Sequence, residues 1–382
     1  MTNSLSYIDS CDQDTDLHRD AGSSSSNHIT TDSDPHPGGY HKRVVSVESS
    51  PVFDGLPDSV EGSPFVAVDR DVHYTLGDAY DEIRDLSRHH HDRVVSLQDV
   101  TGVTVNQIRI GDQTHTISQV AARSLCARLD LPYKYLRSLP GHLQRVNFAH
   151  GLQQHRDKEF FVRFDGDQVR GLFSTRYVPI DHVQIIEALL RCGIPAGRRV
   201  QLEMDYTLMR LSVVDSLRTF EMGLNDPHTP GISIINSELG LSSFSVAPYV
   251  LRLVCTNGLI SKVRGAATNF RHVSDRALKQ MPQILCSAYK QVGDQQHQLR
   301  SATQLPVSDP VAALHSIARQ FGLDRQQRDA VTWALPFEMT TNNTLFNIVQ
   351  TITKAAHYSG LTTEQNTQLQ QVGGEVLRLV ER

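Results

Sequence analysis

The pattern of apolar and polar positions divides the chain into an unpatterned leader and three patterned regions. The first 64 residues hold few apolar positions and are rich in Pro, Gly, Ser and Asp. Such a segment buries too little surface to offset its ordering entropy, so we expect a disordered acidic leader at 1–64. The rest is expected to comprise a mostly helical N-terminal region at 65–148, a β-rich central domain at 149–300 and a helical C-terminal region at 301–382.

The N-terminal region combines helical periodicity with one alternating stretch. Helices are predicted at residues 78–87, 118–129 and 133–139. The second of these helices has Ser118 as its N-cap. Alternating apolar residues across 103–117 predict a small hairpin. The last two helices also fit a DNA-reading helix–turn–helix, although Pro132 at their joint favours a packing corner.

The central region alternates with the two-residue period of β-strands. Strands are predicted at residues 160–164, 169–173, 200–214 (one strand or a pair), 219–224, 231–235 and 244–255. A helix is predicted to begin after an N-cap at Asp181 and to end before Gly193. Asn257-Gly258 predicts a hairpin turn after the last strand, because both residues tolerate positive φ. This order predicts an α+β fold with a central antiparallel β-sheet, flanking helices and a helical C-terminal region.

The C-terminal part returns to helical periodicity. Helices are predicted at residues 275–298, 310–321, 325–333, 344–357 and 363–380. We expect a break in the first of them near Met281-Pro282, because Pro lacks the backbone N–H that a helix interior needs.

Several protein classes are excluded by the pattern. No run approaches eighteen apolar residues and the N-terminus lacks a basic region followed by an apolar one, so we expect a cytoplasmic protein without membrane contact. The five cysteines form no C-x-x-C pair, which predicts buried free thiols in a reducing compartment and no zinc site. No metal and no cofactor is predicted.

The net charge of −5 is unevenly distributed. The 64-residue leader holds eleven Asp/Glu and three Lys/Arg, a net charge of −8. The other 318 residues hold 34 Lys/Arg and 31 Asp/Glu, a net charge of +3. An acidic tail on a mildly basic body is compatible with nucleic-acid binding.

Sequence signals for an enzyme are weak, since no short catalytic motif is present. Glu203 and Asp205 share one face of a predicted strand and, with Glu238, would supply carboxylates to Mg²⁺; the alternative is the polar face of a half-exposed strand. The histidines at 89–91 suggest a metal site, but adjacent residues on a helix point in different directions, so an exposed helix end is the simpler interpretation.

The residues that best suit nucleic acid lie beside the predicted strands. Arg170, Arg176 and Tyr177 precede the helix start at Asp181, where guanidinium groups and a helix N-terminus suit phosphate. The alternative is a structural corner in which Arg176 pairs with Asp181 or Glu238. A second candidate set of phosphate-binding and stacking residues is Lys262, Arg264, Phe270, Arg271, Arg276 and Lys279. A solvated helix face is the alternative for this second set.

Polar residues also occupy the two loops of the predicted hairpin region. These loop residues are Ser237, Glu238, Thr256 and Asn257. A lone carboxylate such as Glu238 would serve either as a general base or as an anchor for Arg176 or Arg252.

Four segments resemble a known family. The segment 169–181 is similar to the pattern R-A-x-x-S-x-R-Y-x-x-I-D, and segments 236–243, 251–258 and 345–356 follow it in the same order. Together they resemble a phage- and plasmid-associated family, the domain of unknown function 932, over about residues 115–380. The resemblance implies a mobile-element setting and carries no mechanism.

These observations favour a nucleic-acid-binding accessory protein. We expect DNA as partner, in replication or recombination of a mobile element, with the acidic leader competing for the DNA-binding surface. One alternative is a metal-dependent enzyme that acts on nucleic acid. Another is a self-assembling homo-oligomer without substrate.

Overall fold

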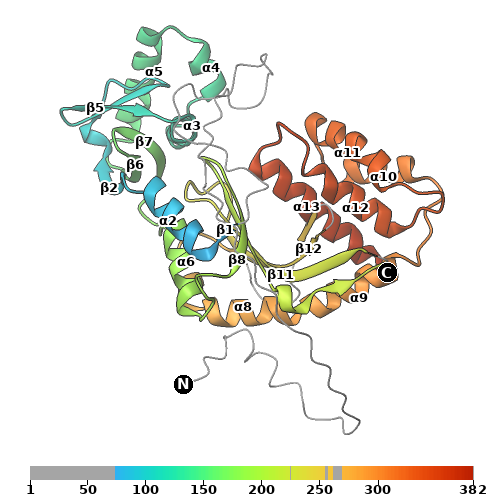
Figure 1. Cartoon of the computed structure of the whole chain (residues 1–382). Coiled ribbons are helices and arrows are strands. Elements are labelled where there is room, and N and C mark those ends of the chain that lie inside the picture. Colours follow the sequence, from blue (N-terminus) through green and yellow to red (C-terminus); the bar gives the residue numbers. More distant parts are fainter. Residues whose placement is uncertain (1–73, 224, 254–256, 261–268, 382) are drawn as a thin grey trace, which may run out of the picture.

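The computed structural model describes residues 74–223, 225–253, 257–260 and 269–381, and it shows an α+β protein built on two sheets (Figure 1). One sheet has the strand order β2 (His90–Ser96), β6 (Glu159–Asp165), β7 (Gln168–Ser174), β5 (Gln113–Ile117), β4 (Gln107–Ile110) and β3 (Val100–Thr101). Only β5 and β7 are parallel among its described pairs, so this sheet is mixed.

The second sheet is antiparallel throughout its described pairs. Its order is β1 (Tyr74–Thr75), β8 (Arg199–Met204), β9 (Met209–Val214), β11 (Pro227–Asn236), β12 (Phe244–Arg252) and β13 (Asn257–Ile260), with β10 (Phe220–Glu221) on β11 and β14 (Asn269–Phe270) on β12. The long strands β11 and β12 form its centre and pair from His228–Arg252 to Ile235–Ser245.

Helices cover both sheets. They are α2 (Leu76–Leu86), α3 (Gln119–Arg128), α4 (Tyr133–Ser138), α5 (Gly141–Gln154), α6 (His182–Arg191), α7 (Arg276–Lys279), α8 (Met281–Lys290), α9 (Val292–Ala302), α10 (Pro310–Gln320), α11 (Arg325–Glu338), α12 (Leu345–Ala355) and α13 (Thr363–Leu377). The predicted caps are present, because the Ser118 hydroxyl accepts from the Ala121 N–H and Asp181 forms a capping box with Gln184.

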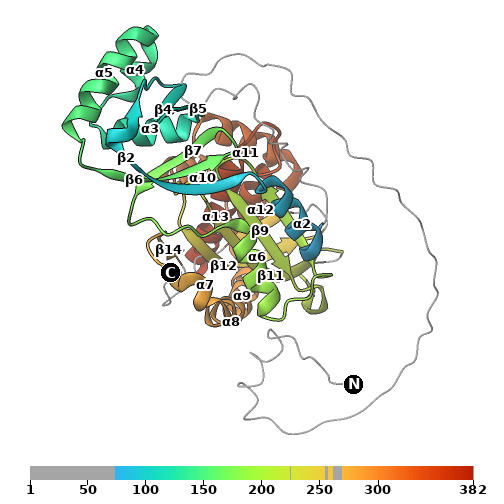
Figure 2. The same ribbon diagram turned by 90° about the vertical axis from the view of Figure 1, so that its left-hand side faces the viewer.

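Three main hydrophobic cores follow from this arrangement. Helices α2, α6 and α8 pack against one face of the eight-stranded sheet, and α12 and α13 pack against its other face (Figure 1). The six-stranded sheet carries α3, α4 and α5 at the far end of the molecule (Figure 2). The two sheets therefore have separate apolar cores, and other groups must join them.

The α+β prediction is confirmed, and the region at 65–148, expected to be mostly helical, contains strands as well as helices. Strands β2 to β5 lie in this region, and β2 pairs along its whole length with β6. The predicted boundary at 148 therefore cuts through the six-stranded sheet. The histidines at 89–91 do not end a helix, because His90 and His91 are the first residues of strand β2 and pair with Asp165 and Phe164 of β6.

The predicted turn at Asn257-Gly258 is also placed differently. Both residues begin strand β13, where Asn257 is paired with Arg252 and Gly258 with Leu251. Glycine is needed at 258 for close packing, since a Cβ there would lie 2.4 Å from the Tyr249 hydroxyl and 2.6 Å from Gln370 Oε1. Gly258 is therefore required by the close packing of β12, β13 and α13, and the Asn-Gly pair does not mark a turn.

The cysteine prediction holds in part within the described residues. Cys126 and Cys192 are buried free thiols. Cys286 on α8 is disulfide-bonded, so the expectation that all five thiols are free is wrong. Among the described residues, no helix is long and apolar enough to span a lipid bilayer.

We predict that Gly258→Ala destabilises the fold. The added methyl group overlaps Tyr249 and Gln370, which are both buried, and overpacking of this kind costs roughly 1–3 kcal/mol. Urea unfolding measures the difference. The matched control is Gly293→Ala on α9, where nothing lies within 4 Å of the new methyl group. This control is expected to stabilise the protein by about 0.5–1 kcal/mol, and equal stability of both variants would contradict the packing argument.

Candidate functional site

A buried polar cluster lies where the eight-stranded sheet meets the six-stranded sheet. Strand β11 ends at Asn236, and a tight turn from Ser237 to Gly240 follows. Gly240 has φ of +68°, which favours glycine, and its N–H donates to the Ser237 carbonyl. Asn236, Ser237 and Glu238 are each at most 4% exposed, so the turn is inserted into the protein.

Glu238 is the centre of this cluster. Its Oε2 accepts from Arg170 Nη2 on β7 at 2.6 Å, and its Oε1 accepts from the His182 N–H at the start of α6 at 2.8 Å. Its backbone carbonyl accepts from the Tyr177 hydroxyl at 2.9 Å and from Arg163 Nη1 on β6 at 3.2 Å. One residue of the eight-stranded sheet's loop therefore binds two strands of the other sheet.

The charges around Glu238 keep it ionised. Burial by itself raises the pKa of this carboxyl, but His182, Arg170 and Arg163 outweigh burial and hold the pKa well below its usual range. Burial also lowers the pKa of His182. The two guanidinium groups and the His182 N–H therefore stabilise the carboxylate.

Arg163 binds two further carboxylates of the cluster. Its side chain is 2% exposed and lies 3.0 Å from Asp92 on β2 and 2.5 Å from Asp181 at the N-cap of α6. Burial alone lowers the pKa of Arg163, but Asp181, Glu238 and Asp92 raise it above its ordinary value. Asp181 therefore caps helix α6 and also serves as a counter-ion of Arg163.

Asn236 organises the neutral part of the cluster. Its Nδ2 donates to the Ile180 carbonyl at 2.8 Å and to His182 Nδ1 at 3.0 Å, while its Oδ1 accepts from His272 Nε2 at 3.0 Å. The Tyr177 ring stacks on His272 and on Phe173, with ring centroids 5.4 and 4.0 Å apart. These contacts fix Tyr177 as a packing residue.

A small cavity opens beside the ion pair. It has a volume of about 20 Å³ and is lined by residues that include His90, Arg170, Asp205 and Tyr206. His90 Nε2 and Arg170 Nε are buried there without a hydrogen-bond partner. A cavity of this size holds about one water molecule, which suits these two groups.

The cluster does not suit general-base or metal catalysis. Both carboxylate oxygens of Glu238 are engaged, and its lowered pKa makes it a weak base. Among the described residues, no group of three His, Cys, Asp or Glu is placed to hold a metal ion. The geometry favours the anchor interpretation of Glu238, with Arg170 as its partner in place of the expected Arg176 or Arg252.

The other proposed carboxylates are also engaged. Glu203 on β8 forms an ion pair with Arg210, which is its cross-strand neighbour on β9. Asp205 Oδ1 accepts from two backbone N–H groups in its own turn, and Oδ2 accepts from the Thr363 N–H of α13 at 3.2 Å. Glu203 and Asp205 therefore hold a turn and a helix in place.

The expected phosphate-binding residues fall into two groups. Arg170 is 3% exposed and bound to Glu238, so it has no donor for a phosphate at the surface. Tyr177 and Phe270 are partly buried, and Phe270 packs against the core near Phe244, so neither ring is open for stacking on a base. Arg176, Arg271, Arg276 and Lys279 are exposed. Lys262, Arg264 and Thr256 lie outside the described residues, as does the side chain of Asn257.

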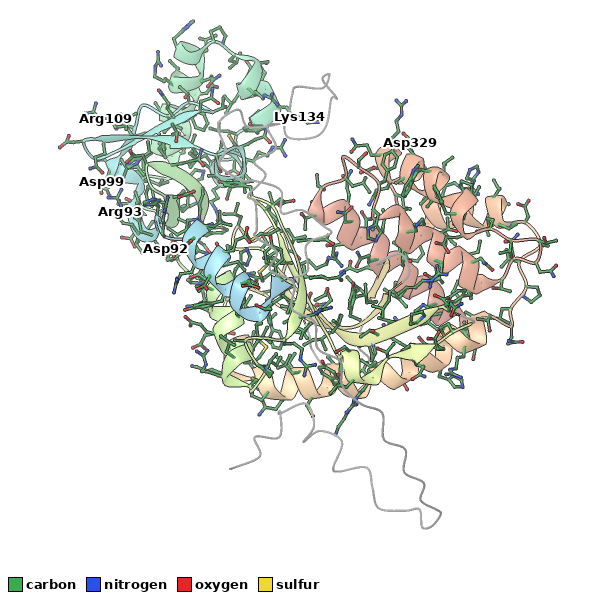
Figure 3. All side chains as sticks on the ribbon, viewed as in Figure 1. Asp92, Arg93, Asp99, Arg109, Lys134 and Asp329 are labelled. Carbon is green, nitrogen blue, oxygen red and sulfur yellow. The ribbon has the colours of Figure 1, made fainter. Side chains whose placement is uncertain are left out.

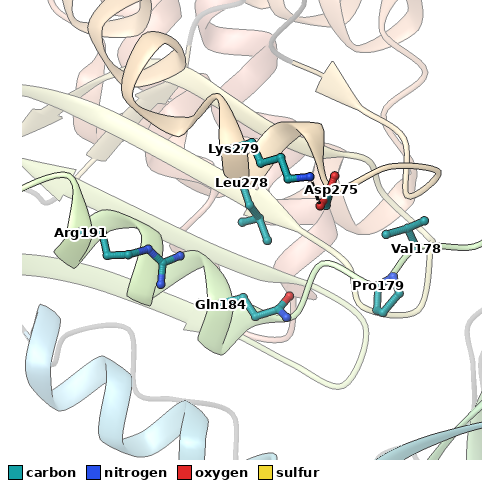
Figure 4. A pocket seen from close by; sticks show the side chains of 7 residues that line it. All are labelled: Val178, Pro179, Gln184, Arg191, Asp275, Leu278 and Lys279. Carbon is teal, nitrogen blue, oxygen red and sulfur yellow. Dashed lines mark ion pairs between the residues drawn. The ribbon is translucent and has the colours of Figure 1, made fainter.

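An open hollow separates helices α6 and α7 (Figure 4). Its volume is about 510 Å³, and its lining residues are Val178, Pro179, Gln184, Arg191, Asp275, Leu278 and Lys279. Lys279 pairs with Asp275 at 2.7 Å, and Arg191 lies 3.8 Å from Glu187. Arg176, Arg271 and Arg276 form no ion pair within the described part of the chain.

Sequence reasoning did not assign several residues to this cluster. These are His90, Arg163, His182, Asn236 and His272. A signal was present for Arg163, because a charged residue interrupts the apolar strand Phe160–Phe164 and strand charges of this kind are usually paired. The histidines gave no signal, since burial is decided by distant segments.

A family model described as Domain of unknown function (DUF932) matches residues 170–375. No curated protein and no solved structure matches the chain. The match begins at Arg170 and includes Glu238, so both partners of the central ion pair lie inside it, whereas β2, β6 and helices α3 to α5 precede it.

We predict that Glu238→Gln lowers stability strongly. The substitution leaves the Arg170 guanidinium buried without a counter-ion, which costs roughly 3–5 kcal/mol. Chemical unfolding measures the loss, and Glu187→Gln on the surface of α6 is the control, with an expected change below about 1 kcal/mol. A Glu238→Gln variant with unchanged stability would show that the carboxylate is not a structural anchor.

We also predict a pH-dependent stability. Burial, together with Arg170, lowers the pKa of His90 to about 4, and burial, together with Arg163, lowers the pKa of His272 to about 4. The unfolded chain takes up these protons below about pH 6.5 and the folded chain only below about pH 4, so stability falls in that window as pH falls. Each histidine contributes about 1.4 kcal/mol per pH unit.

Unfolding curves between pH 4 and 7 measure this slope. His90→Gln removes one titrating ring, so its slope is expected to be smaller than that of the unchanged protein by one histidine's share. An identical slope in both proteins would show that His90 is not held neutral by the fold.

Proposed function

This chain belongs to the family of the domain of unknown function DUF932, and we propose that it binds nucleic acid through the phosphate backbone. The proposed contact is the α6–α7 face, defined as Arg176, Arg191, Arg271, Arg276 and Lys279. The observation that supports it is the exposure of these five cations, of which Arg191 and Lys279 line the open hollow.

The backbone brings the two halves of this face together. The Val178 N–H donates to the His272 carbonyl at 2.9 Å, so the segment that carries Arg176 lies beside the segment that carries Arg271. Arg276 and Lys279 follow on α7, and Arg191 lies across the hollow on α6 (Figure 4). Exposed guanidinium groups without counter-ions attract phosphates and release bound salt ions on contact.

This face favours recognition of the backbone over recognition of bases. Tyr177 and Phe270, the rings expected to stack on bases, are partly buried and pack against other side chains. Arg170 is held by Glu238. The proposed binding is therefore independent of sequence and strongly dependent on salt.

The biological setting is part of the proposal. The family resemblance supports an accessory role in replication or recombination of a phage- or plasmid-like element, with the protein in the cytoplasm. A metal-dependent enzyme has less support, because the described carboxylates that were candidates for Mg²⁺ are engaged by arginines or backbone N–H groups.

We predict that the triple variant Arg176→Ala, Arg271→Ala, Arg276→Ala weakens binding to oligonucleotides. Each lost phosphate contact reduces the slope of log K against log salt by about 0.9 for duplex DNA, so three contacts reduce it by roughly 3. Filter binding at several salt concentrations measures the slope. The control replaces three exposed arginines on other surfaces: Arg88→Ala, Arg109→Ala, Arg319→Ala.

The control is expected to bind as the unchanged protein does. If the unchanged protein shows no salt-dependent retention of single- or double-stranded DNA, the proposed function is wrong. If the triple variant and the control lose equal affinity, binding depends on overall charge and the α6–α7 face is not the site.

A further inference from the structure

The most basic part of the described chain lies outside the α6–α7 face. Residues 118–158 contain seven Lys/Arg and two Asp, a net charge of +5. The basic residues are Arg123, Arg128, Lys134, Arg137, Arg145, Arg156 and Lys158. This segment forms α3, α4 and α5, which we call the helical cap, and it precedes the family match at 170–375.

The cap is attached to the six-stranded sheet by its inner face. The hydroxyls of Ser118 and Ser124 donate to the carbonyls of Arg170 and Leu172 on β7. Leu125 and Phe148 are fully buried in the core below. The basic residues of the cap are exposed except for Arg128, which is partly buried over the Phe160 ring. The cap itself lies at the projecting end of the molecule (Figures 1 and 2).

Acidic groups of the cap do not neutralise these cations. Asp130 pairs with His155 at 3.3 Å. Within the described residues, Lys134, Arg145 and Arg156 are exposed and form no ion pair. Unpaired cations on one small part of the molecule produce a positive potential that attracts a polyanion.

The cap also carries an exposed aromatic ring. Tyr135 is 56% exposed, and Lys134 precedes it on α4. Arg145 reaches back toward the start of α5, since its Nη1 lies 3.8 Å from the position of a Cβ on Gly141. The Arg123 guanidinium lies over the neighbouring Tyr133 ring at 5.3 Å. Exposed cations and an open ring on one surface are typical of proteins that bind single-stranded nucleic acid.

The geometry of the cap disagrees with the helix–turn–helix alternative. Helix α3 is packed on β7, and α4 has six residues and an inward-facing Leu136. A packed α3 and an α4 of only six residues do not match the recognition helix of a helix–turn–helix. The exposed groups suit phosphates and an unpaired base.

We propose that the helical cap is a second nucleic-acid-binding surface and that it prefers single strands. Lys134 and Arg145 contact phosphates, and Tyr135 stacks on a base. This proposal goes beyond the α6–α7 face, because it rests on different residues of a different sheet and predicts a strand preference. The exposed side chains of Leu143 and Val146 on α5 would also suit an anionic membrane surface, which the test separates.

The test uses the full chain with a fluorescent single-stranded oligonucleotide and a duplex of equal length. Lys134→Ala with Arg145→Ala is expected to reduce the salt slope for the single strand by about 1.4, since each contact contributes about 0.7. Tyr135→Ala is expected to weaken single-strand binding on the order of tenfold, with an unchanged salt slope and unchanged duplex binding.

Controls separate the two surfaces. The matched control is Arg88→Ala with Arg109→Ala, because these two exposed residues lie outside the cap. Figure 3 shows Arg109 and Lys134 on opposite sides of the part formed by the six-stranded sheet and the cap. Thermal unfolding of each variant verifies the fold. The triple variant of the α6–α7 face is measured beside them.

The possible outcomes distinguish the two proposed surfaces. Weaker single-strand binding by the cap variants supports the helical cap, whether or not the α6–α7 variant binds normally. Normal binding by the cap variants overturns it and leaves the α6–α7 proposal intact. Binding of the unchanged protein to vesicles with anionic lipid, but to neither oligonucleotide, overturns both proposals and assigns the cap to a membrane surface.

Discussion

The fold depends on one buried carboxylate that joins two sheets with separate apolar cores. Glu238 leaves the end of β11 and accepts from Arg170 of the other sheet and from the first turn of α6. A buried charge is costly unless it is paired and fully hydrogen-bonded. The turn, the helix start and the two strands must therefore keep their relative positions, because displacement of any one of them leaves an uncompensated charge.

This constraint divides the arginines of the chain into two classes. Arg163, Arg170 and Arg210 are each at most 3% exposed and serve as internal counter-ions. Arg176, Arg271 and Arg276 are exposed, and so are most of the basic residues of the helical cap. The internal class explains why abundant arginine does not by itself indicate a nucleic-acid surface. The exposed class supplies the physical basis of both proposed binding surfaces.

The two proposed surfaces differ in what they offer a ligand. The α6–α7 face has exposed cations and a hollow, while its neighbouring rings pack against other side chains. The cap combines cations with an exposed Tyr135. The family match covers the first surface and stops short of the second. With both surfaces, the protein would bind the phosphate backbone of any nucleic acid at the α6–α7 face. The helical cap would distinguish single strands from duplexes.

Local sequence determined most of the elements, because caps, turns and periodicity act over a few residues. Ser118 and Asp181 begin their helices as expected, and the hairpin of β6 and β7 turns at Gly166 with φ of +52°. The tertiary structure decided which side chains meet. Long-range packing decides the pairing of β2 with β6 and the close contacts of Gly258. It also brings Arg170 into an ion pair with Glu238, 68 positions away in the sequence. Segments that are distant in sequence decide whether a charged side chain faces solvent or a counter-ion. Periodicity therefore predicts which face of a helix or strand is buried, but it does not predict which segment packs against that face.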